Sequence, residues 1–381
     1  MILGIDASNI SSGGGLNHLK NLLNCADPKK LGFSSVILWS SQATLDKIDN
    51  HTWLSKCSDP LLERGLFYRS YWKLARLTGL VEASKCDLLF VPGGSYIGSI
   101  SPVVTMSRNL LPFEFAELKR YGFSLKALKL LVLRSIQSRT FENVEGIIFL
   151  TEYAKSVVLR AIRHADARLQ TIPHGIDLKF FNLPKPQYSI GNYNFKSKPI
   201  KVVYVSIVEL YKHQWNVVLA IKKLRDVGIP VELELIGPAS PLAYKKLEKT
   251  RNKIDPTASF CHYLGDIPND ELPNRLKEAD ICVFASSCEN MPNILLECMA
   301  SGLPIACSNR GPMPEILGEA GVFFNPENVE DIRKALELLC SSEELRTDLS
   351  GRSYEMAKKY SWENCAEETF SFLRDIAVAN P

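Results

Sequence analysis

The chain has 381 residues. At about 100–200 residues per domain, this length predicts two domains. Apolar residues make up 46% of the sequence and charged residues 23%, which is ordinary for a folded protein and excludes a disordered one. The 45 basic and 42 acidic residues leave a net charge of only +3, so the balance argues against a nucleic-acid partner.

The N-terminus and the cysteines point to a cytoplasmic protein. The first residues enter a strand-like run and lack the basic start, apolar stretch and cleavage site of a secretory signal. No apolar run approaches the roughly 20 residues needed to span a bilayer. The ten cysteines include no C-x-x-C pair, and several stand in apolar runs. We therefore expect buried, reduced thiols rather than disulfides or zinc ligands.

Short apolar runs alternate with longer amphipathic stretches. Strands are expected at residues 1–6, 35–39, 87–91, 102–106, 146–150 and 170–172, and at 201–207, 231–236, 259–264, 280–285, 304–307 and 322–324. Runs this uniformly apolar are typical of parallel strands covered on both faces. The pattern predicts two Rossmann-like, doubly wound α/β domains joined by a linker at 182–199, with ligands at the carboxyl ends of the strands.

The most informative segment covers residues 282–326. A strand ends near Ala285, a polar turn carries Glu289, and a helix that begins near Asn293 contains Glu297. A carboxylate accepts two hydroxyl hydrogen bonds well, so two glutamates near one strand end suit a sugar or ribose diol. The free N–H groups of a helix start suit phosphate. Taken alone, Glu297 also fits a purely structural role at the helix start.

This segment resembles the donor-site signature of retaining GT-B glycosyltransferases of the family-4 type, the glycosyl transferases group 1. The matching residues are Glu289, Glu297, Ala300, Gly302, Pro304, Pro314, Glu315 and Ile316. The resemblance implies the GT-B fold, two Rossmann-like domains facing a cleft, and a nucleotide-sugar donor on the C-terminal domain. It places Glu297 at the ribose and Glu289 at the donor sugar. The residues implied to line the sugar and diphosphate are Asn290, Met291, Pro292, Asn293 and Ile294.

The stretch 201–220 resembles the strand, loop and helix that carry the family's phosphate-binding basic pair. Lys212 matches the lysine, whose ammonium would offset the charge of the departing diphosphate. The resemblance thus implies catalytic roles for Lys212 and Glu289. The partner arginine has no match, and His213 is a candidate substitute cation or a surface histidine. Gly237 ends the strand at 231–236 and matches a loop near the nucleotide.

In the N-terminal half, Gly13, Gly14 and Gly15 follow the first strand without forming a G-x-G-x-x-G fingerprint. Glycines allow backbone N–H groups to approach an anion closely. The run resembles the family's loop that faces the donor phosphates. His18 matches a histidine of the following helix and equally fits a packed helix residue.

Arg108 and Asn109 stand where many relatives carry a histidine near the reacting sugar. They are candidates for contact with an anionic acceptor or a donor phosphate, and a surface arginine is the alternative for Arg108. No D-x-D occurs, so we expect a donor site that needs no metal and no cofactor beyond the nucleotide sugar. The stretch from Lys119 to Arg139 has six basic residues and no acidic one among many apolar ones. It predicts either peripheral contact with the inner face of a membrane or a packed helix with a solvated basic face.

The expected organisation is an acceptor-binding domain at 1–190, a nucleotide-sugar-binding domain at 191–360 and a closing helix at 361–381 that crosses back. The expected function is retaining, metal-independent transfer of a sugar from a nucleoside-diphosphate sugar to a hydroxyl of a glycan or lipid-linked acceptor, as in polysaccharide or lipopolysaccharide biosynthesis. Two alternatives stay open: a non-catalytic GT-B-like partner subunit, and a GT-B nucleotide-sugar epimerase.

Overall fold

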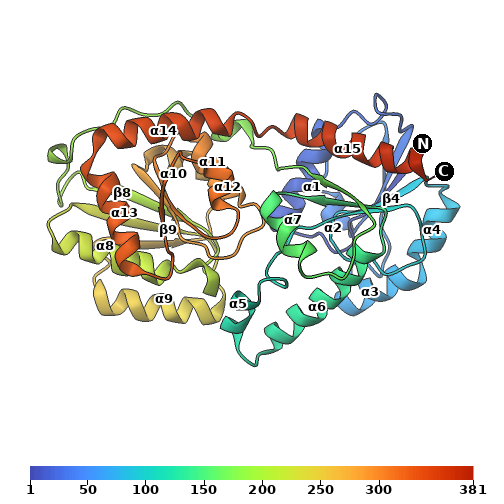
Figure 1. Cartoon of the computed structure of the whole chain (residues 1–381), viewed down its shortest axis with the longest axis horizontal. Coiled ribbons are helices and arrows are strands. Elements are labelled where there is room, and N and C mark those ends of the chain that lie inside the picture. The colour runs from blue at the N-terminus through green and yellow to red at the C-terminus, as the bar shows by residue number, and fades with distance from the viewer. Residues whose placement is uncertain (381) are drawn as a thin grey trace. The chain divides into compact units, whose positions relative to one another are not determined.

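The protein was analysed as a computed structural model that describes residues 1–380, apart from the side chain of Leu66. Its chain forms two compact units (Figure 1). The first contains Met1–Leu118, Gly122–Gly175 and the residues from Ser361 onward, and the second contains Lys119–Tyr121 and Ile176–Tyr360. The main division therefore falls after Gly175, whereas the sequence pattern placed it after residue 190.

The first unit is built on seven parallel strands in the order β3-β2-β1-β4-β5-β6-β7. They are β1 (Ile2–Asp6), β2 (Ser35–Trp39), β3 (Leu54–Cys57), β4 (Leu88–Val91), β5 (Val103–Met106), β6 (Gly146–Phe149) and β7 (Arg168–Thr171). Its helices are α1 (Gly13–Cys25), α2 (Gln42–Leu45), α3 (Leu66–Ala75), α4 (Leu77–Ala83), α5 (Phe115–Leu118), α6 (Leu125–Glu142), α7 (Glu152–Leu159) and α15 (Trp362–Ala379). Helix α15 packs against α1, because Phe370, Leu373 and their neighbours form its buried face.

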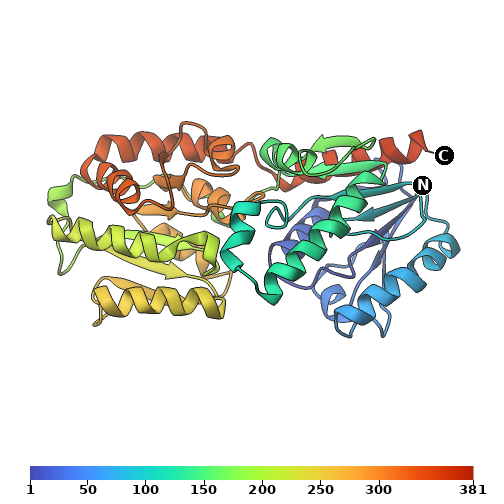
Figure 2. The same ribbon diagram turned by 60° about the horizontal axis from the view of Figure 1, so that its bottom comes forward.

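The second unit has six parallel strands in the order β10-β9-β8-β11-β12-β13. They are β8 (Ile200–Val205), β9 (Val231–Ile236), β10 (Cys261–Gly265), β11 (Ile281–Phe284), β12 (Ile305–Ser308) and β13 (Val322–Phe324). Its helices are α8 (Gln214–Asp226), α9 (Pro241–Ile254), α10 (Leu272–Glu278), α11 (Asn293–Ala300), α12 (Met313–Leu317), α13 (Val329–Ser341) and α14 (Glu343–Ala357), with 3₁₀ turns η1 (Lys119–Tyr121), η2 (Leu178–Phe180), η3 (Ile190–Asn192) and η4 (Leu210–Lys212). Figure 2 shows helices on both sides of each sheet.

All twelve predicted strands are present, each bound lying within two residues of the expected one. The thirteenth strand, β3, was not predicted, because its sequence LSKC is short, polar and only half-buried. The stretch from Lys119 to Arg139 is not one continuous helix. It comprises η1, a turn with Gly122 in a left-handed conformation, and the start of α6.

The strand order sets where each unit can hold a ligand. In the second sheet the chain runs outward from β8 to β9 and β10 and then returns to β11 on the other side of β8. Such a switch in direction leaves a crevice beyond the carboxyl ends of the two central strands, because the connections diverge there. The loop after β8 leads to Lys212, and the loop after β11 leads to Glu289. The fold therefore brings these two loops to the same edge of the sheet.

The segment predicted as a linker is anchored to the second unit. Arg346 of α14 is buried and donates from Nε to Oε1 of Gln187 at 2.9 Å and from another nitrogen to the carbonyl of Tyr188. The same guanidinium donates to the carbonyl of Cys340 at the end of α13 at 3.0 Å. Composition alone could not show this anchoring, because the arginine stands more than 150 residues away.

All ten cysteines are free thiols. Seven of them are buried, whereas Cys25, Cys57 and Cys86 are half-buried. Among residues 1–380, no helix is both long and apolar enough to cross a membrane.

Candidate functional site

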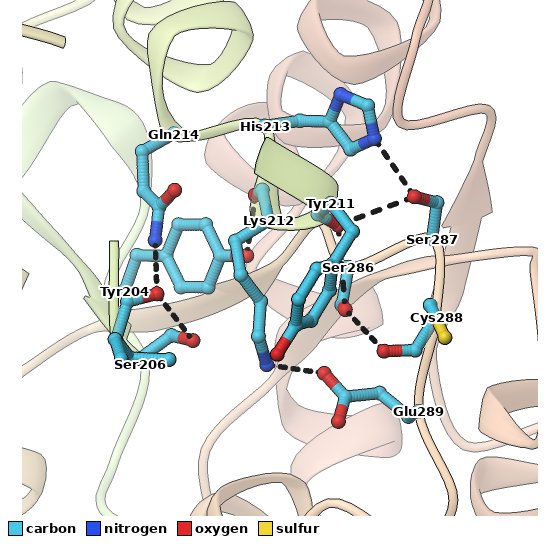
Figure 3. Close-up of polar contacts among 11 residues, drawn as sticks. Tyr204, Ser206, Tyr211, Lys212, His213, Gln214, Ser286, Ser287, Cys288 and Glu289 are labelled. Atoms are coloured by element: carbon cyan, nitrogen blue, oxygen red, sulfur yellow. Dashed lines mark hydrogen bonds and ion pairs between the residues drawn. The ribbon is translucent and has the colours of Figure 1, made fainter. Parts of the chain in front are cut away.

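The ammonium of Lys212 and the carboxylate of Glu289 form an ion pair at the switch point of the second sheet (Figure 3). Their side chains are 7% and 14% exposed, so the pair is largely withdrawn from water. Lys212 ends the 3₁₀ turn η4, and Glu289 lies between β11 and α11. Two residues for which the sequence predicted catalytic roles are thus in contact, although they are 77 residues apart in the chain.

Aromatic rings line the lysine stem. The Lys212 Nζ lies 5.3 Å from the ring centre of Tyr211 and 5.1 Å from that of Phe284. The Tyr204 hydroxyl, on β8, donates to the Lys212 carbonyl at 2.7 Å. Burial and the nearby Glu289 charge raise the pKa of the Tyr211 hydroxyl, so this ring stays neutral beside the ion pair. These rings, together with the ion pair to Glu289, account for the low exposure of the lysine side chain.

Hydrogen bonds join the β8 loop to the β11 loop. The Ser287 N–H donates to the Tyr211 carbonyl at 2.8 Å, and the Ser287 hydroxyl lies 2.9 Å from Nε2 of His213. Before the turn, the Glu209 carboxylate accepts from the Leu210 N–H at 3.0 Å and from the Ser240 hydroxyl at 3.1 Å. These bonds fix both loops, which is how Lys212 and Glu289 are held together.

His213 does not supply a second positive charge in this environment. It is 2% exposed and adopts a left-handed conformation (φ 51°) just before α8. Burial and the charge of Arg120 lower the pKa of its imidazole to about 4, so it is neutral at pH 7. The interpretation of His213 as a substitute cation is therefore wrong. The sequence missed this because surface exposure was assumed for a polar turn.

Gly237 stands where β9 ends, and its φ of +133° strongly favours glycine. A Cβ built on it would lie 2.4 Å from the carbonyl oxygen of Ser206. The glycine therefore lets the ends of β8 and β9 approach each other. Next to it, the Gln214 amide donates to the Ile207 carbonyl at 3.0 Å and closes the same loop.

The residues between Glu289 and α11 lie close to the ion pair in sequence and are mostly buried. Asn290 and Met291 are each 7% exposed, Pro292 precedes the helix, and Asn293 is its first residue. The side-chain oxygen of Asn293 is buried and has no hydrogen-bond partner within residues 1–380. No side chain caps this helix start, so its first N–H groups are available to a ligand. Ile294, the second helix residue, is half-buried.

Glu297 lies one turn into α11, on the side facing η2. Burial raises the pKa of its carboxyl to about 7, although the charge of Lys179 opposes the shift. Asp177 adds to the rise in pKa. The sequence analysis did not single out these two charged neighbours of Glu297, which stand about 120 residues earlier in the chain. Glu297 is therefore a carboxyl group whose ionisation is shifted toward neutral pH.

The candidate residues of the first unit form a separate group. Gly13 (φ +61°) and Gly14 are exposed at the start of α1, whose N-cap Ser12 makes no side-chain cap. Gly15 lies under the Arg108 guanidinium, since a Cβ there would be 3.1 Å from two of its nitrogens. Burial lowers the pKa of Arg108 to about 10, which leaves it charged at pH 7. Asn109 is exposed and accepts the Leu111 N–H at 3.1 Å.

His18 is a packed helix residue. It is fully buried in α1, and its Nδ1 lies 2.9 Å from Nδ1 of His174, so one imidazole donates to the other. Its ring centre is 5.6 Å from that of Trp362 on α15. Burial lowers the pKa of both imidazoles, that of His174 to about 3, so both are neutral.

No group of three His, Cys, Asp or Glu side chains that could hold a metal ion occurs in the described part of the chain. The positive charge at the β8–β11 crevice comes from Lys212, together with the N-terminus of α11, which no side chain caps. A lysine, a carboxylate and amide donors can bind a diphosphate and sugar hydroxyls without further groups.

Residues 189–356 match the family model described as glycosyl transferases group 1. This part of the chain belongs to that family. The match encloses Lys212, Gly237, Glu289 and Glu297, so the group 1 domain contains the whole β8–β11 site.

Two relatives are similar in sequence to parts of this chain. The O-antigen chain mannosyltransferase B of Escherichia coli is 33% identical over 112 residues, which are 29% of each chain. The GDP-mannose-dependent alpha-(1-6)-phosphatidylinositol monomannoside mannosyltransferase of Mycobacterium tuberculosis is 26% identical over 259 residues, 64% of this chain and 65% of the relative. The chain thus spans less than two thirds of the length of these relatives.

The fold is shared over the whole length of a solved structure. The sucrose-phosphate synthase of Thermosynechococcus elongatus superposes with a TM-score of 0.76 at 16% identity, covering 100% of both chains. The predicted GT-B fold, with a parallel α/β sheet in each unit, is confirmed.

Proposed function

We propose that the protein is a glycosyltransferase that moves a sugar from a nucleoside-diphosphate sugar to a hydroxyl of a glycan or lipid-linked acceptor. The second unit binds the donor, and the first unit binds the acceptor. Transfer proceeds with retention of the anomeric configuration and without a metal ion. The observation that carries the proposal is the buried Lys212–Glu289 ion pair beyond β8 and β11.

In the proposed donor complex, the Lys212 ammonium turns from Glu289 toward the diphosphate. Charge builds up on the leaving phosphate oxygen as its bond to the anomeric carbon breaks, and a nearby ammonium stabilises that charge. Glu289 then accepts hydrogen bonds from donor-sugar hydroxyls. Glu297 in its ionised form accepts from the two ribose hydroxyls. The ion pair keeps both groups in place before the donor arrives.

The backbone N–H groups of Asn290 and Met291, with those of Asn293 and Ile294 at the start of α11, bind the sugar and diphosphate, and Pro292, which has no N–H, lines the same site. The buried and unpartnered Asn293 oxygen supports this assignment, because such a group costs free energy unless a ligand or water satisfies it. Gly237 gives the nucleotide access to the end of β9. In the first unit, Gly13, Gly14 and Gly15 are proposed to bind phosphate oxygens through their backbone amides.

Retention follows if the acceptor hydroxyl attacks on the face from which the phosphate leaves. The bond from the anomeric carbon to the phosphate oxygen breaks, the bond to the acceptor oxygen forms, and the acceptor proton passes to the departing phosphate. No side chain has to act as a base in this sequence. Arg108 and Asn109 are proposed to contact an anionic group of the acceptor or the donor.

The printed names of the relatives support the donor class. One relative is named as dependent on GDP-mannose, and another as a mannosyltransferase of O-antigen chains. We therefore extend the proposal to a sugar donor activated by a nucleoside diphosphate and to a glycan or lipid-linked acceptor at the inner membrane face. The corresponding role is polysaccharide or lipopolysaccharide synthesis.

The test incubates the purified full chain with UDP- and GDP-sugars, with and without simple glycan acceptors, in the presence of EDTA. Release of nucleoside diphosphate and the glycosylated product are measured together, and NMR of the product reports the anomeric configuration. The proposal predicts acceptor-dependent product with retained configuration, unaffected by EDTA. An interconverted donor without acceptor would instead identify an epimerase. If the chain neither binds nor turns over any of the donors, it is a non-catalytic subunit.

A matched pair of variants localises the activity. Lys212→Met should lower transfer by about a hundredfold or more, because it removes one charge at the leaving group. Lys222→Met is the control, since the Lys222 side chain on α8 is 39% exposed and pairs with Asp226 four residues further on. Equal activity in both variants would remove Lys212 from the mechanism.

A further inference from the structure

Helix α6 exposes its apolar residues. Leu125, Leu128 and Val132 follow one another at three- and four-residue spacing, and their exposed fractions are 78%, 58% and 52%. The opposite side of the helix buries Ala127, Leu130, Gln137 and Phe141. An amphipathic helix that packs only for the stability of its own unit keeps its apolar residues on the inward side. Here a second set of apolar residues faces outward.

Helix α3 has the same arrangement. Phe67, Tyr71 and Leu74, at four- and three-residue spacing, are 79%, 54% and 60% exposed. Trp72, on the other side of the helix, is completely buried. Two separate helices of the first unit therefore present aromatic and aliphatic side chains to solvent.

The loop at residues 95–101 connects these helices. The Lys73 ammonium on α3 donates to the Ser95 carbonyl at 3.2 Å, and the Thr140 hydroxyl on α6 donates to the Tyr96 carbonyl at 2.9 Å. Ile97 of this loop is 51% exposed. Figures 1 and 2 both show α3 and α6 side by side along one edge of the first unit. We call this surface the α3–α6 face and define it by Phe67, Tyr71, Leu74, Ile97, Leu128 and Val132.

Basic residues outnumber acidic ones around the α3–α6 face, where Glu142 ends α6 and Glu145 lines a cavity together with Ile97. Residues 64–76 contain four basic and no acidic residues, and so do residues 122–139. This is a local excess, because the whole chain has 45 basic and 42 acidic residues. Lys73 and Arg76 pair with Asp6 and Asp59.

The remaining six basic residues of the two stretches are Arg64, Arg69, Lys126, Lys129, Arg134 and Arg139. A cavity of about 410 Å³ adjoins the exposed side of α6 and is lined by Arg134, Arg139 and Arg163, with Glu142 at its wall. Arginine binds phosphate oxygens in a planar, paired geometry, so Arg139 and Arg163 are the candidate phosphate ligands, whereas the Arg134 guanidinium lies 4.3 Å from the ring centre of Phe115.

We propose that the α3–α6 face binds the surface of an anionic lipid bilayer. The exposed apolar side chains enter the interfacial region, the surrounding cations attract the lipid charges, and the arginine-lined cavity receives a phosphate headgroup. A second copy of the chain fits the face poorly, because two such surfaces would bring like charges together. The inference does not depend on the proposed transfer reaction.

The experiment measures co-flotation of the full chain with vesicles in the absence of donor and acceptor. One set of vesicles is phosphatidylcholine alone, and the other contains about one third phosphatidylglycerol. Wild-type protein should float with the anionic vesicles, and about 0.5 M salt should release most of it because the attraction is screened. Leu128→Ser/Val132→Ser, Phe67→Ser/Leu74→Ser and Lys129→Glu should each lower the partition coefficient about tenfold.

Val378→Ser is the matched control, because Val378 is also in the first unit and is 65% exposed but lies on α15. It should float like the wild type. Circular dichroism verifies that each variant is folded, and sedimentation gives its oligomeric state. The proposal is wrong if the wild type does not float with anionic vesicles, if the face variants float as well as the control, or if they change only self-association.

Discussion

The ion pair between Lys212 and Glu289 allows stability and activity to be separated in one set of variants. Both side chains are mostly buried, at 7% and 14% exposure. Removing one partner leaves a charge without its counter-charge in a poorly solvated place. For buried pairs this costs about 3–5 kcal/mol, and the slight exposure here favours the lower end, about 3 kcal/mol. At roughly 2–4 °C per kcal/mol for a unit of this size, Lys212→Met should lower Tm by about 6–12 °C.

The double variant Lys212→Met/Glu289→Gln removes both charges and keeps the side-chain volumes. Replacing both members of a buried pair is often neutral or stabilising, so its Tm should return to within a few degrees of the wild type. Transfer activity should not return. The double variant lacks both the ammonium that stabilises the leaving phosphate and the carboxylate that accepts hydrogen bonds from the donor sugar. Differential scanning calorimetry gives the stability, and nucleoside-diphosphate release gives the rate.

Two results would refute this reasoning. Lys212 and Glu289 are not coupled if the losses in Tm of Lys212→Met alone and Glu289→Gln alone simply add in the double variant. The catalytic role is absent if the double variant, once its stability has recovered, transfers sugar within threefold of the wild type. Lys222→Met, which touches only a surface ion pair, should change Tm by no more than about 2 °C.

Two other variants test the surroundings of the ion pair. Burial raises the pKa of Glu297 to about 7, so protonation of this carboxyl stabilises the folded state. This stabilisation is complete below pH 4.5 and is lost as the pH rises to about 7, so the Tm of the wild type should fall over this range. Glu297→Gln should show no such decline in Tm between pH 5 and 8. Donor affinity, measured by calorimetric titration, should improve over the same interval in the wild type only, and parallel pH profiles of the two proteins would contradict the assignment. Gly237→Ala places a methyl group 2.4 Å from the Ser206 carbonyl oxygen at a residue with φ +133°. The variant should therefore lower Tm by several degrees and weaken donor binding. An unchanged Tm would show that the ends of β8 and β9 separate freely.

The sequence predicted most of the sheet because its strands are buried on both faces and therefore read as apolar runs. The exception, β3, has a polar edge sequence and gives no such signal. The boundary after Gly175 was missed for a different reason. Contacts decide where a unit ends, and the anchoring by Arg346 of the segment around Gln187 leaves no trace in local composition.

The candidate site was predicted in part. Lys212 and Glu289 were found through a family resemblance, and their contact follows from the strand order. Tyr211 in η4 and Phe284 at the end of β11, both beside the ammonium, were missed, because aromatic residues in such positions look like ordinary core. The neutral state of His213 was also beyond reach, since it depends on burial by segments distant in sequence.

The central claim is that the crevice beyond β8 and β11 holds the donor diphosphate. A crystal structure of the full chain with UDP or GDP tests it most directly. The account predicts the Lys212 ammonium within hydrogen-bond distance of a phosphate oxygen and the Glu297 carboxylate accepting from the ribose hydroxyls. A nucleotide bound elsewhere, with Lys212 still paired only to Glu289, would contradict it.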